Sequence, residues 1–541
     1  MNKASDSARG EVPVLIAGEW RPAKNPAGTF AAVDPATKAP LPDLYPVSSG
    51  DDVALACQAG LEAVAALQAR PAGEVAENIA LFFDDYAARI EAAADALCEM
   101  AARETGYPVT PRLRNVELPR TTNQLRQGAA AARDRSWCHA TIDTKANLRS
   151  KFAALGGPVV VFGPNNFPFA FNSIAGGDFV AAIAAGNPVI GKANTGHPGT
   201  SRLLGELALA AVRASGLPPA MVQLIYRTPP AVGFALVSHP AVAATGFTGS
   251  KNAGLQLKEA ADRAGKPIYL EMSSVNPIFI LPGALAERSA AVAKELFDSC
   301  ALGAGQFCTR PGLSVVQGDA NGEAFIAAVG ASFAQGTPGT LLGASGLAGI
   351  VSGLDELRKN GAEIVAGGHP IEGPRFCFAN TLLRVSAEQF LAHPHALQTE
   401  AFGTVNTVVV AKDVAQMAEV AAKLEGNLTG AIYSDTAGKD DDAYARLATV
   451  LRPRVGRLLN DKMPTGVAVS SAMNHGGPFP ATGHPGFTAV GIPASIMRFA
   501  ALHCYDNVRS HRLPPELANK NPTGKMWRLI DGEWSQRDVA A

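Results

Sequence analysis

The sequence predicts an α/β chain built on a parallel, doubly wound sheet, followed by a second α/β unit. From Gly156 onward, short β-branched runs alternate with segments of helical composition, and the alternation resumes after Asn276. Strands and helices that alternate at this length are typical of parallel sheets covered by helices. Before Gly156, residues 137–152 are polar and alternating, which predicts an exposed β-ribbon.

The region before residue 137 is predicted to be mainly helical. Residues 14–20 indicate a short strand with its turn, and residues 25–37 are turn-rich. Residues 51–68, 74–104 and 113–133 are helical in composition, with apolar residues at helical spacing in the first two. Thr105-Gly106 supplies a helix stop, and Pro119 predicts a kink or an early-turn position.

The central region is predicted to form the doubly wound sheet. Its alternating segments are residues 159–162, 170–185, 189–192, 199–214, 222–226, 232–238, 243–247, 253–263 and 268–271. Such sheets bind ligands at the carboxyl ends of their strands. Residues 165–166, 192–197 and 248–250 fall at those ends, so we expect them to face a ligand.

A second α/β unit is predicted from residue 276. It begins with a strand at 278–281 and a helix at 284–301, and a loop containing Cys308 follows directly. Further strands are predicted at 312–317, 382–385, 404–411 and 454–459. A Gly/Pro-rich stretch then spans residues 475–491, before a tail that ends at 527–534.

Composition excludes several classes of protein. The 541 residues carry 47 basic and 48 acidic side chains, a net charge of −1, which gives no electrostatic case for nucleic acid or an anionic membrane. Seven scattered cysteines without a Cys-x-x-Cys pair fit neither a disulfide framework nor a zinc cage. Residues 1–11 are polar, unlike a signal peptide, and the most apolar window, 174–191, is interrupted by polar residues. We therefore expect a cytoplasmic protein with no membrane partner and no metal.

Three segments contain the parts that covalent carbonyl chemistry needs. Cys308 lies in a loop of small residues, Glu271 ends an apolar run, and Asn166 follows a β-like run within Pro-Asn-Asn-Phe-Pro. A thiol nucleophile, a base and an oxyanion donor are those parts. The alternatives are an inert buried cysteine and a glutamate in a structural ion pair. His475-Gly-Gly-Pro is compatible with a pocket loop or a plain turn.

Two strand-end segments suggest an anion site. The run from Gly186 to Ala193 resembles a P-loop, but Ala193 replaces the magnesium-binding Ser or Thr, which argues against a triphosphatase. Lys192 can reach a phosphate or ribose, or can simply be solvated. Gly249-Ser250 opens a helix whose free amides suit an anion, although a Ser N-cap explains the same residues and G-x-G-x-x-G is absent.

Taken together, these segments resemble the aldehyde dehydrogenase superfamily, in its order and near its spacing. The resemblance covers residues 14–500 and is carried by Phe162-Gly-Pro-Asn-Asn-Phe-Pro168, Lys192, Gly246-Phe-Thr-Gly-Ser250, Leu270-Glu-Met-Ser273, Gly305-Gln-Phe-Cys308 and Glu400-Ala-Phe-Gly403. Longer runs resemble the branch of α-ketoglutaric semialdehyde and NADP-linked fatty aldehyde dehydrogenases. They are Glu104-Thr-Gly106, Arg120-Thr121 with Gln124-Leu-Arg126, Ala175-Gly-Gly-Asp178, His197-Pro-Gly-Thr-Ser201 and His475-Gly-Gly-Pro-Phe-Pro-Ala-Thr482.

The resemblance implies a role for each matching residue. Cys308 would attack the aldehyde, Asn166 and the Cys308 amide would hold the oxyanion, and Glu271 would activate water against the thioester. The residues expected to bind the cofactor are Lys192, Thr195, Gly249, Ser250, Glu400, Phe402, Phe162 and Pro164. Those expected to contact the substrate are Arg310, Phe167 and His475.

Departures from the family bear on the cofactor and the substrate. Many NAD-using members carry an acidic residue where this chain has Thr195, so we expect NADP, with NAD as the alternative. An arginine that the branch often places before the next helix is Pro230 here, with Arg227 nearby, which weakens the case for NADP. Arg310 stands where the branch often has Asn, and it either anchors a substrate carboxylate or holds its loop.

The family also implies an architecture and a reaction. We expect a Rossmann-type cofactor domain at 1–270, interrupted by an oligomerisation β-arm at about 135–153. A catalytic domain would follow at 271–475, and a C-terminal segment at 476–541 would return to the cofactor domain and the subunit interface. The expected reaction is NAD(P)-dependent oxidation of a small semialdehyde such as 2,5-dioxopentanoate by a homodimer or homotetramer. Alternatives are a fatty aldehyde dehydrogenase, a cysteine esterase or acyltransferase, and a silent structural protein.

Overall fold

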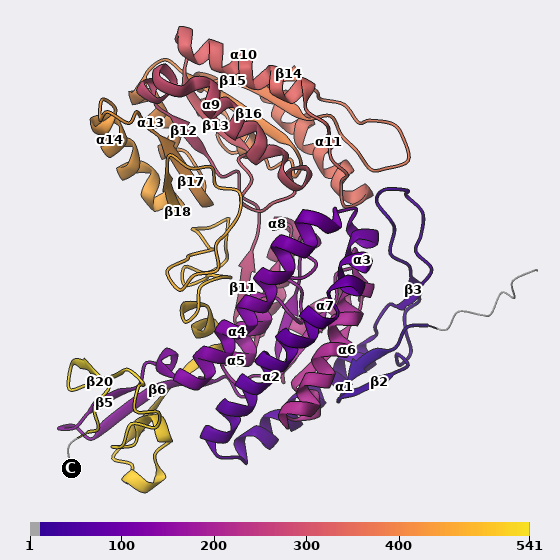
Figure 1. Cartoon of the computed structure of the whole chain (residues 1–541), viewed down its shortest axis with the longest axis vertical. Helices are drawn as coiled ribbons and strands as arrows, with labels where there is room; N and C mark the ends of the chain where they lie inside the picture. Colours follow the sequence, from indigo (N-terminus) through magenta and orange to yellow (C-terminus); the bar gives the residue numbers. More distant parts are fainter. Residues whose placement is uncertain (1–10, 540–541) are drawn as a thin grey trace, which may run out of the picture.

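The computed structural model describes residues 11–539 and confirms a mixed α/β fold (Figure 1). Two bodies, each built on a sheet of its own, lie one above the other in the view of Figure 1, and a β-arm extends from the lower one. The polar residues 1–10 lie outside the described range, as do residues 540–541. In the described part of the chain, no helix combines the length and the apolar character needed to cross a bilayer.

The first sheet has seven strands in the order β11-β10-β7-β8-β9-β1-β2. Its five parallel strands are β7 (Val159–Phe162), β8 (Val189–Lys192), β9 (Val222–Ile225), β10 (Ala244–Thr248) and β11 (Ile268–Glu271). The hairpin of β1 (Val14–Ile16) and β2 (Glu19–Arg21) is added antiparallel at one edge. These β-branched runs form strands because helices cover both faces, as in other parallel sheets.

Eight helices accompany this sheet in the described chain. They are α1 (Gly50–Gln68), α2 (Ala72–Ala92), α3 (Ala94–Thr105), α4 (Leu118–Asp134), α5 (Gly177–Ala184), α6 (Pro198–Ser215), α7 (Pro230–Val237) and α8 (Lys251–Arg263). Helix α3 ends where expected, with Gly106 in the left-handed conformation at φ 68°. A small hairpin, β3 (Thr29–Phe30) and β4 (Tyr45–Pro46), precedes α1.

The helical segment predicted over residues 74–104 is divided at Ala93 into α2 and α3. Two further helix predictions need correction. Helix α5 begins only at Gly177, whereas residues 170–185 are predicted as one helix, because the Asn172 side chain bonds Pro168 O and Ile174 N and holds a turn. The first residues of the helix predicted over 113–133 belong instead to η1 (Val109–Glu117), a wider helical segment that runs directly into α4. Both segments lie beside the site described below.

The second sheet also has seven strands, in the order β14-β15-β16-β13-β12-β17-β18. They are β12 (Ile278–Ile280), β13 (Leu313–Gln317), β14 (Glu363–Ala366), β15 (Thr381–Ser386), β16 (Val405–Ala411), β17 (Asn427–Tyr433) and β18 (Val455–Asn460). All pairs are parallel except β14 with β15. Its helices are α9 (Pro282–Ala301), α10 (Ala320–Gln335), α11 (Ala344–Lys359), α12 (Ala387–Ala392), α13 (Val414–Ala422) and α14 (Asp441–Leu451).

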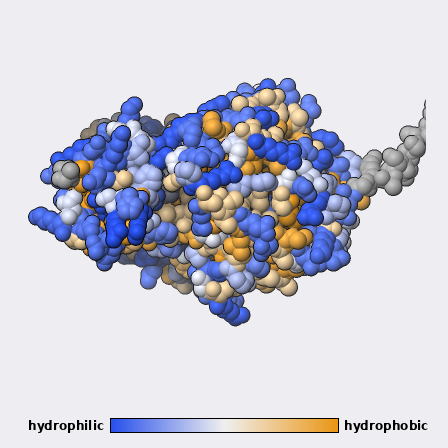
Figure 2. Space-filling model, turned by 90° about the horizontal axis from the view of Figure 1, so that it is seen from below, coloured by the Kyte–Doolittle hydropathy of each residue, from blue (hydrophilic) through white to orange (hydrophobic). Residues whose placement is uncertain are grey.

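The arm is a five-stranded sheet in the order β19-β6-β5-β20-β21. It joins the predicted ribbon, β5 (Thr141–Asp143) and β6 (Leu148–Ala154), to the C-terminal β19 (Ala500–Asp506), β20 (Arg528–Ile530) and β21 (Glu533–Ser535). Seen from below, the arm end at the left is covered mainly by hydrophilic residues, and apolar ones gather on the larger body (Figure 2). The tail predicted at 527–534 is therefore part of the arm.

Candidate active site

The loop that carries Cys308 is shaped by an unusual backbone turn. After α9, the segment η4 (Leu302–Gly305) places Gly303, Ala304 and Gly305 in the left-handed region, at φ 60°, 56° and 71°. A Cβ on Gly305 would lie 2.1 Å from the carbonyl carbon of Gly403, so only glycine fits there. The side-chain amide of Asn276 fixes the loop by donating a hydrogen bond to the carbonyl of Cys308 at 2.8 Å.

Glu271 reaches the same point from the first sheet. It ends β11 and is 1% exposed, and it forms an isolated bridge with Thr482 of the C-terminal segment. Met272 N also donates to Ala481 O at 2.8 Å. Through these contacts the C-terminal segment lies against the end of β11, which places His475 in the site.

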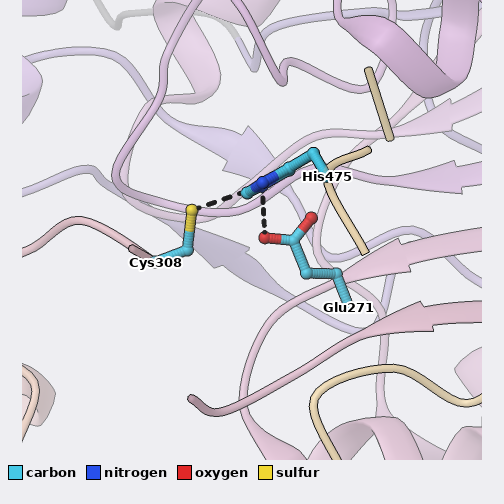
Figure 3. A group of neighbouring side chains, drawn as sticks. All are labelled: Glu271, Cys308 and His475. Atoms are coloured by element: carbon cyan, nitrogen blue, oxygen red, sulfur yellow. Dashed lines mark hydrogen bonds and ion pairs between the residues drawn. The ribbon is translucent and has the colours of Figure 1, made fainter. Parts of the chain in front are cut away.

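His475 lies between the thiol and the carboxylate (Figure 3). Its Nε2 is 3.4 Å from Cys308 Sγ and 2.9 Å from Glu271 Oε1, and the His475 side chain is buried. The second carboxylate oxygen of Glu271, Oε2, is buried without a partner in the described structure. A single nitrogen that contacts both groups can exchange a proton with either. The sequence predicts His475 on the substrate, whereas the structure places it against the nucleophile and the base.

The electrostatics of the site favour a neutral thiol at rest. Burial raises the pKa of Cys308 well above its usual range, the negative charge of Glu271 raises this pKa further, and Arg120 opposes the shift. Because the thiolate is the nucleophile, Cys308 needs a partner that takes its proton or stabilises its charge. His475 is the nitrogen base in contact with it.

Cys308, Glu271 and His475 also have the composition of a metal site. Their ligating atoms lie within 4.8 Å of one another, and thiolate, imidazole and carboxylate are zinc ligands. Cysteine spacing in the sequence predicts no such group, because the three residues come from segments that meet only in the fold. The same three residues supply a nucleophile and two proton acceptors for thiol chemistry.

Asn166 faces the thiol from the loop after β7. It lines the cavity described next and is 5% exposed. One hydrogen of its amide goes to Gln306 O at 2.9 Å, which leaves the other hydrogen of Nδ2 to stabilise an oxyanion. Arg112 donates to the Asn166 carbonyl at 3.1 Å, and His197 Nε2 contacts the Pro164 carbonyl at 2.8 Å, so the loop is fixed from both sides.

A cavity of about 570 Å³ extends from the thiol over the carboxyl ends of the first sheet. It brings together most of the residues singled out in the sequence: Phe162, Pro164, Asn166, Lys192, Thr195, Gly249, Ser250, Glu271, Cys308, Glu400 and Phe402. Glu400 lies near its catalytic end, and burial raises the pKa of this carboxyl to about 7. Among the described residues, the only other carboxylate that lines the cavity is that of Glu271.

The far end of the cavity is positively charged. Burial, together with the smaller effect of the Arg227 charge, lowers the pKa of Lys192 to about 8. Ser250 is the N-cap of α8, and its hydroxyl accepts a hydrogen bond from Ala253 N at 3.4 Å, as the structural alternative proposes. Ser250 also lines the cavity. A lysine beside a helix N-terminus suits a phosphate group.

None of the three residues expected on the substrate, Arg310, Phe167 and His475, lines this cavity. Arg310 is 2% exposed and its two terminal nitrogens donate to the carbonyls of Pro311, Val405 and Ala401, which hold its guanidinium outside the cavity lining. The expectation that Arg310 binds substrate is therefore wrong, and the alternative that it holds its loop applies. Phe167 is buried in an aromatic cluster with Phe171 and Phe307, whose ring centroids lie 5.2 and 5.1 Å away.

Sequence reasoning missed several residues of the site. Met272, Ser273, Ser345 and Gly346 also line the cavity, and the last two come from the start of α11. The role of Arg120, whose charge opposes the rise in the Cys308 pKa, was also missed. Its presence within a run typical of the branch was the signal that could have drawn attention to it.

The model of the aldehyde dehydrogenase family matches residues 20–476. α-Ketoglutaric semialdehyde dehydrogenase 2 of Azospirillum brasilense is 40% identical over 527 residues, which cover 94% of this chain and 96% of the relative. α-Ketoglutaric semialdehyde dehydrogenase of Acinetobacter baylyi is 36% identical, with the same coverage of both chains.

Solved structures agree at the level of the fold. Lactaldehyde dehydrogenase from Escherichia coli superposes with a TM-score of 0.78 at 21% identity, over 92% of this chain and 98% of that one. The 3,6-anhydro-L-galactose dehydrogenase, solved in complex with NAP, gives 0.77 at 20% identity, over 92% and 99%. The family match and the identities to the two semialdehyde dehydrogenases go further than the fold. The chain belongs to the aldehyde dehydrogenase family and is an NAD(P)-dependent enzyme.

Proposed function

We propose that this aldehyde dehydrogenase oxidises a short semialdehyde to its acid, with 2,5-dioxopentanoate, the α-ketoglutaric semialdehyde, as the first candidate. The reaction class follows from the family, and the substrate class from the two semialdehyde dehydrogenases that are 40% and 36% identical over almost the whole chain. The contact of Cys308 with His475, and of His475 with Glu271, is the observation that carries the mechanism.

In the first half-reaction, His475 Nε2 accepts the thiol proton, and Cys308 Sγ attacks the aldehyde carbon. The free amide hydrogen of Asn166 stabilises the oxyanion of the resulting thiohemiacetal. Bound NAD(P) supplies the hydride acceptor when it occupies the cavity beside the thiol. Loss of hydride from the former aldehyde carbon re-forms the carbonyl and leaves a thioester on Cys308.

In the second half-reaction, Glu271 removes a proton from water, which attacks the thioester carbon. The C–S bond breaks, the acid leaves, and the Cys308 thiolate takes back the proton held by His475. The unpartnered Oε2 of Glu271 is the oxygen available to this water. Because His475 contacts Oε1 of the same carboxylate, it fixes the orientation of Glu271 while Oε2 acts as the base.

The cavity fits a dinucleotide, and we propose NADP rather than NAD. Lys192, Thr195 and the N-terminus of α8 lie together, and both carboxylates of the lining belong to its catalytic end. A 2′-phosphate would therefore meet positive charge and a hydroxyl donor, without repulsion from an acid. Thr195→Glu is expected to reverse the preference by restoring an acceptor for the ribose hydroxyls.

The direct test follows reduced-cofactor absorbance with an aldehyde panel, each aldehyde with NAD and with NADP. We expect the highest kcat/KM for a short semialdehyde with NADP, and loss of turnover in Cys308→Ala. Turnover retained by Cys308→Ala would refute the covalent mechanism. Ester cleavage without any dinucleotide-dependent oxidation would instead support the esterase alternative.

We also propose that the chain works as a homodimer or a dimer of dimers joined through the arm. The strand β19 lies at the edge of the arm sheet, and β18 lies at the edge of the second sheet. Edge strands that present unpaired backbone groups are suited to pairing with another chain. Leu502, in β19, is 59% exposed in the single chain, which a subunit interface would explain.

A further inference from the structure

Two arginines flank the aromatic cluster beside the nucleophile, and their surroundings differ. Arg112 forms an ion pair with Glu117 and donates to the Asn166 carbonyl, so its charge is compensated. The other oxygen of Glu117 accepts from the backbone amides of Phe169 and Ala170 at 2.8 and 3.0 Å. Both oxygens of Glu117 therefore have hydrogen-bond donors, and neither of them bonds to Arg120.

Arg120 has no such partner. Within residues 11–539 it makes neither an ion pair nor a hydrogen bond, and its Nε and Nη2 are shielded from solvent. Its guanidinium lies over the rings of Phe171 and Phe167, with Cζ at 5.0 and 5.7 Å from the centroids. The ring faces attract the cation but do not satisfy its N–H donors, so in the described structure no anion is bonded to this guanidinium.

The position of Arg120 points to the substrate. The Phe171 ring contacts both its guanidinium and the His475 imidazole, whose ring centroid lies 5.7 Å from that of Phe171, and His475 contacts Cys308 Sγ. Arg120, Phe167 and Phe171 are not among the residues that line the cofactor cavity. An anion beside Arg120 would therefore reach the thiol from the aromatic side, while the cofactor occupies the other.

We propose that Arg120 binds a carboxylate at the far end of the substrate and so selects oxo acids over alkyl aldehydes. This inference rests on the proposed oxidation of a semialdehyde and assigns the residue that recognises its acid group. The planar guanidinium offers parallel N–H donors that match a carboxylate, which a lysine cannot reproduce. The aromatic cluster would exclude water from the pair and strengthen it.

The test compares 5-oxopentanoate with pentanal, two aldehydes of equal length that differ in the terminal group. In Arg120→Met, we expect kcat/KM for 5-oxopentanoate to fall about 100-fold or more, mainly through KM, and that for pentanal to change less than about 3-fold. Arg120→Lys should recover part of the loss. Arg126→Met is the matched control: Arg126 lies on the same helix, but it pairs with Glu91 on the surface, and both substrates should be unaffected.

Equal losses on both aldehydes would overturn the proposal, because Arg120 would then act on the thiol or on the packing. Equal kcat/KM values of the wild-type enzyme for pentanal and 5-oxopentanoate would also overturn the proposal, while leaving the dehydrogenase function intact. If neither aldehyde is oxidised with NAD or NADP, the proposed function itself fails. Should Arg120→Met not fold, glutarate and pentanoate can be compared as inhibitors of wild-type pentanal oxidation. Stronger inhibition by glutarate supports the anchor, and equal inhibition contradicts it.

Discussion

At the residue scale, His475 determines how the thiol and the carboxylate cooperate. Its Nε2 contacts both Cys308 and Glu271, yet this one nitrogen carries at most one proton. Accepting the thiol proton and donating to the carboxylate are therefore alternative states of one imidazole. In the mechanism that we propose, the two half-reactions are therefore separated in time, with His475 acting on Cys308 first and orienting Glu271 afterwards.

Substitution of His475 should therefore slow the first half-reaction. In His475→Gln we expect the rate of the first turnover to fall by about 10²–10⁴, the usual contribution of a positioned proton acceptor. Glu271→Gln should instead keep a rapid burst of reduced cofactor and then stall at the thioester. Rapid-mixing measurements of cofactor reduction distinguish the two variants. A normal burst in His475→Gln would show that the thiol does not depend on this imidazole.

The two perturbed groups of the cavity predict how cofactor affinity depends on pH. The pKa of Glu400 is raised to about 7, mainly by burial, and that of Lys192 is lowered to about 8, also mainly by burial. A ribose hydroxyl binds best to the ionised Glu400, so affinity should rise as the pH rises through 7. A phosphate binds best to the protonated Lys192, so affinity should fall again above pH 8.

Binding titrations of NADP across this pH range test the prediction. Glu400→Gln should remove the rise on the acidic side, and Lys192→Met the fall on the alkaline side, with weaker binding throughout. Each limb should change affinity by up to about 10-fold per pH unit. A wild-type profile that is flat through both values would contradict the placement of these groups on the cofactor.

At the scale of elements, the sequence identified what depends on local pattern. The strands β7 to β11 were predicted within about one residue, because β-branched runs buried on both faces are distinctive. The helix predicted over residues 170–185 was wrong over its first seven residues. Composition alone could not show that Gly176 packs where a Cβ would lie 2.4 Å from the Cα of Phe171.

The limits of prediction from the sequence are clearer for the candidate active site. Cys308, Glu271 and Asn166 could be singled out because they sit in a loop or at strand ends, where ligands bind in such sheets. The contact of His475 with them depends on the C-terminal segment pairing with β11, which no local pattern encodes. For Arg310 and Arg120 the sequence shows the same side chain, and only packing reveals that the first donates to three backbone carbonyls while the second makes no hydrogen bond in the described structure.

The turn before Cys308 gives the element-scale prediction. Gly305→Ala would place a Cβ 2.1 Å from the carbonyl carbon of Gly403, in a backbone conformation that disfavours alanine. We expect a loss of at least about 2 kcal/mol in stability and a larger loss of activity, because the loop that carries the thiol must shift. Thermal melts and kcat measure the two effects.

Gly349→Ala is the matched control. Gly349 lies within α11, and a Cβ there would have no neighbour within 4 Å. Alanine in a helix interior is favoured over glycine by about 0.5–1 kcal/mol, so this variant should be at least as stable as the wild type. Wild-type activity in Gly305→Ala would mean that the turn does not position Cys308.

At the scale of the whole molecule, the site is assembled from regions far apart in the sequence. Glu271 ends a strand of the first sheet, Cys308 precedes a strand of the second, and His475 arrives with the segment that continues into the arm. The chain runs from that segment to β19 at the arm edge, so the arm and the site share one stretch of backbone. The atoms of this triad nevertheless come from a single chain.

Association through the arm should therefore be separable from the chemistry. Leu502→Lys places a charge on the outer strand of the arm, where the exposed side chain contributes little to the folding of one chain. If β19 joins subunits, light scattering coupled to size-exclusion chromatography should show the wild type as a dimer or tetramer. The variant should shift toward monomer at micromolar concentration, with kcat largely retained.

Val116→Lys, at an apolar residue 56% exposed outside the arm, should leave the mass unchanged. A wild type that is monomeric under these conditions would refute the interface, and an unchanged mass for Leu502→Lys would place the interface elsewhere.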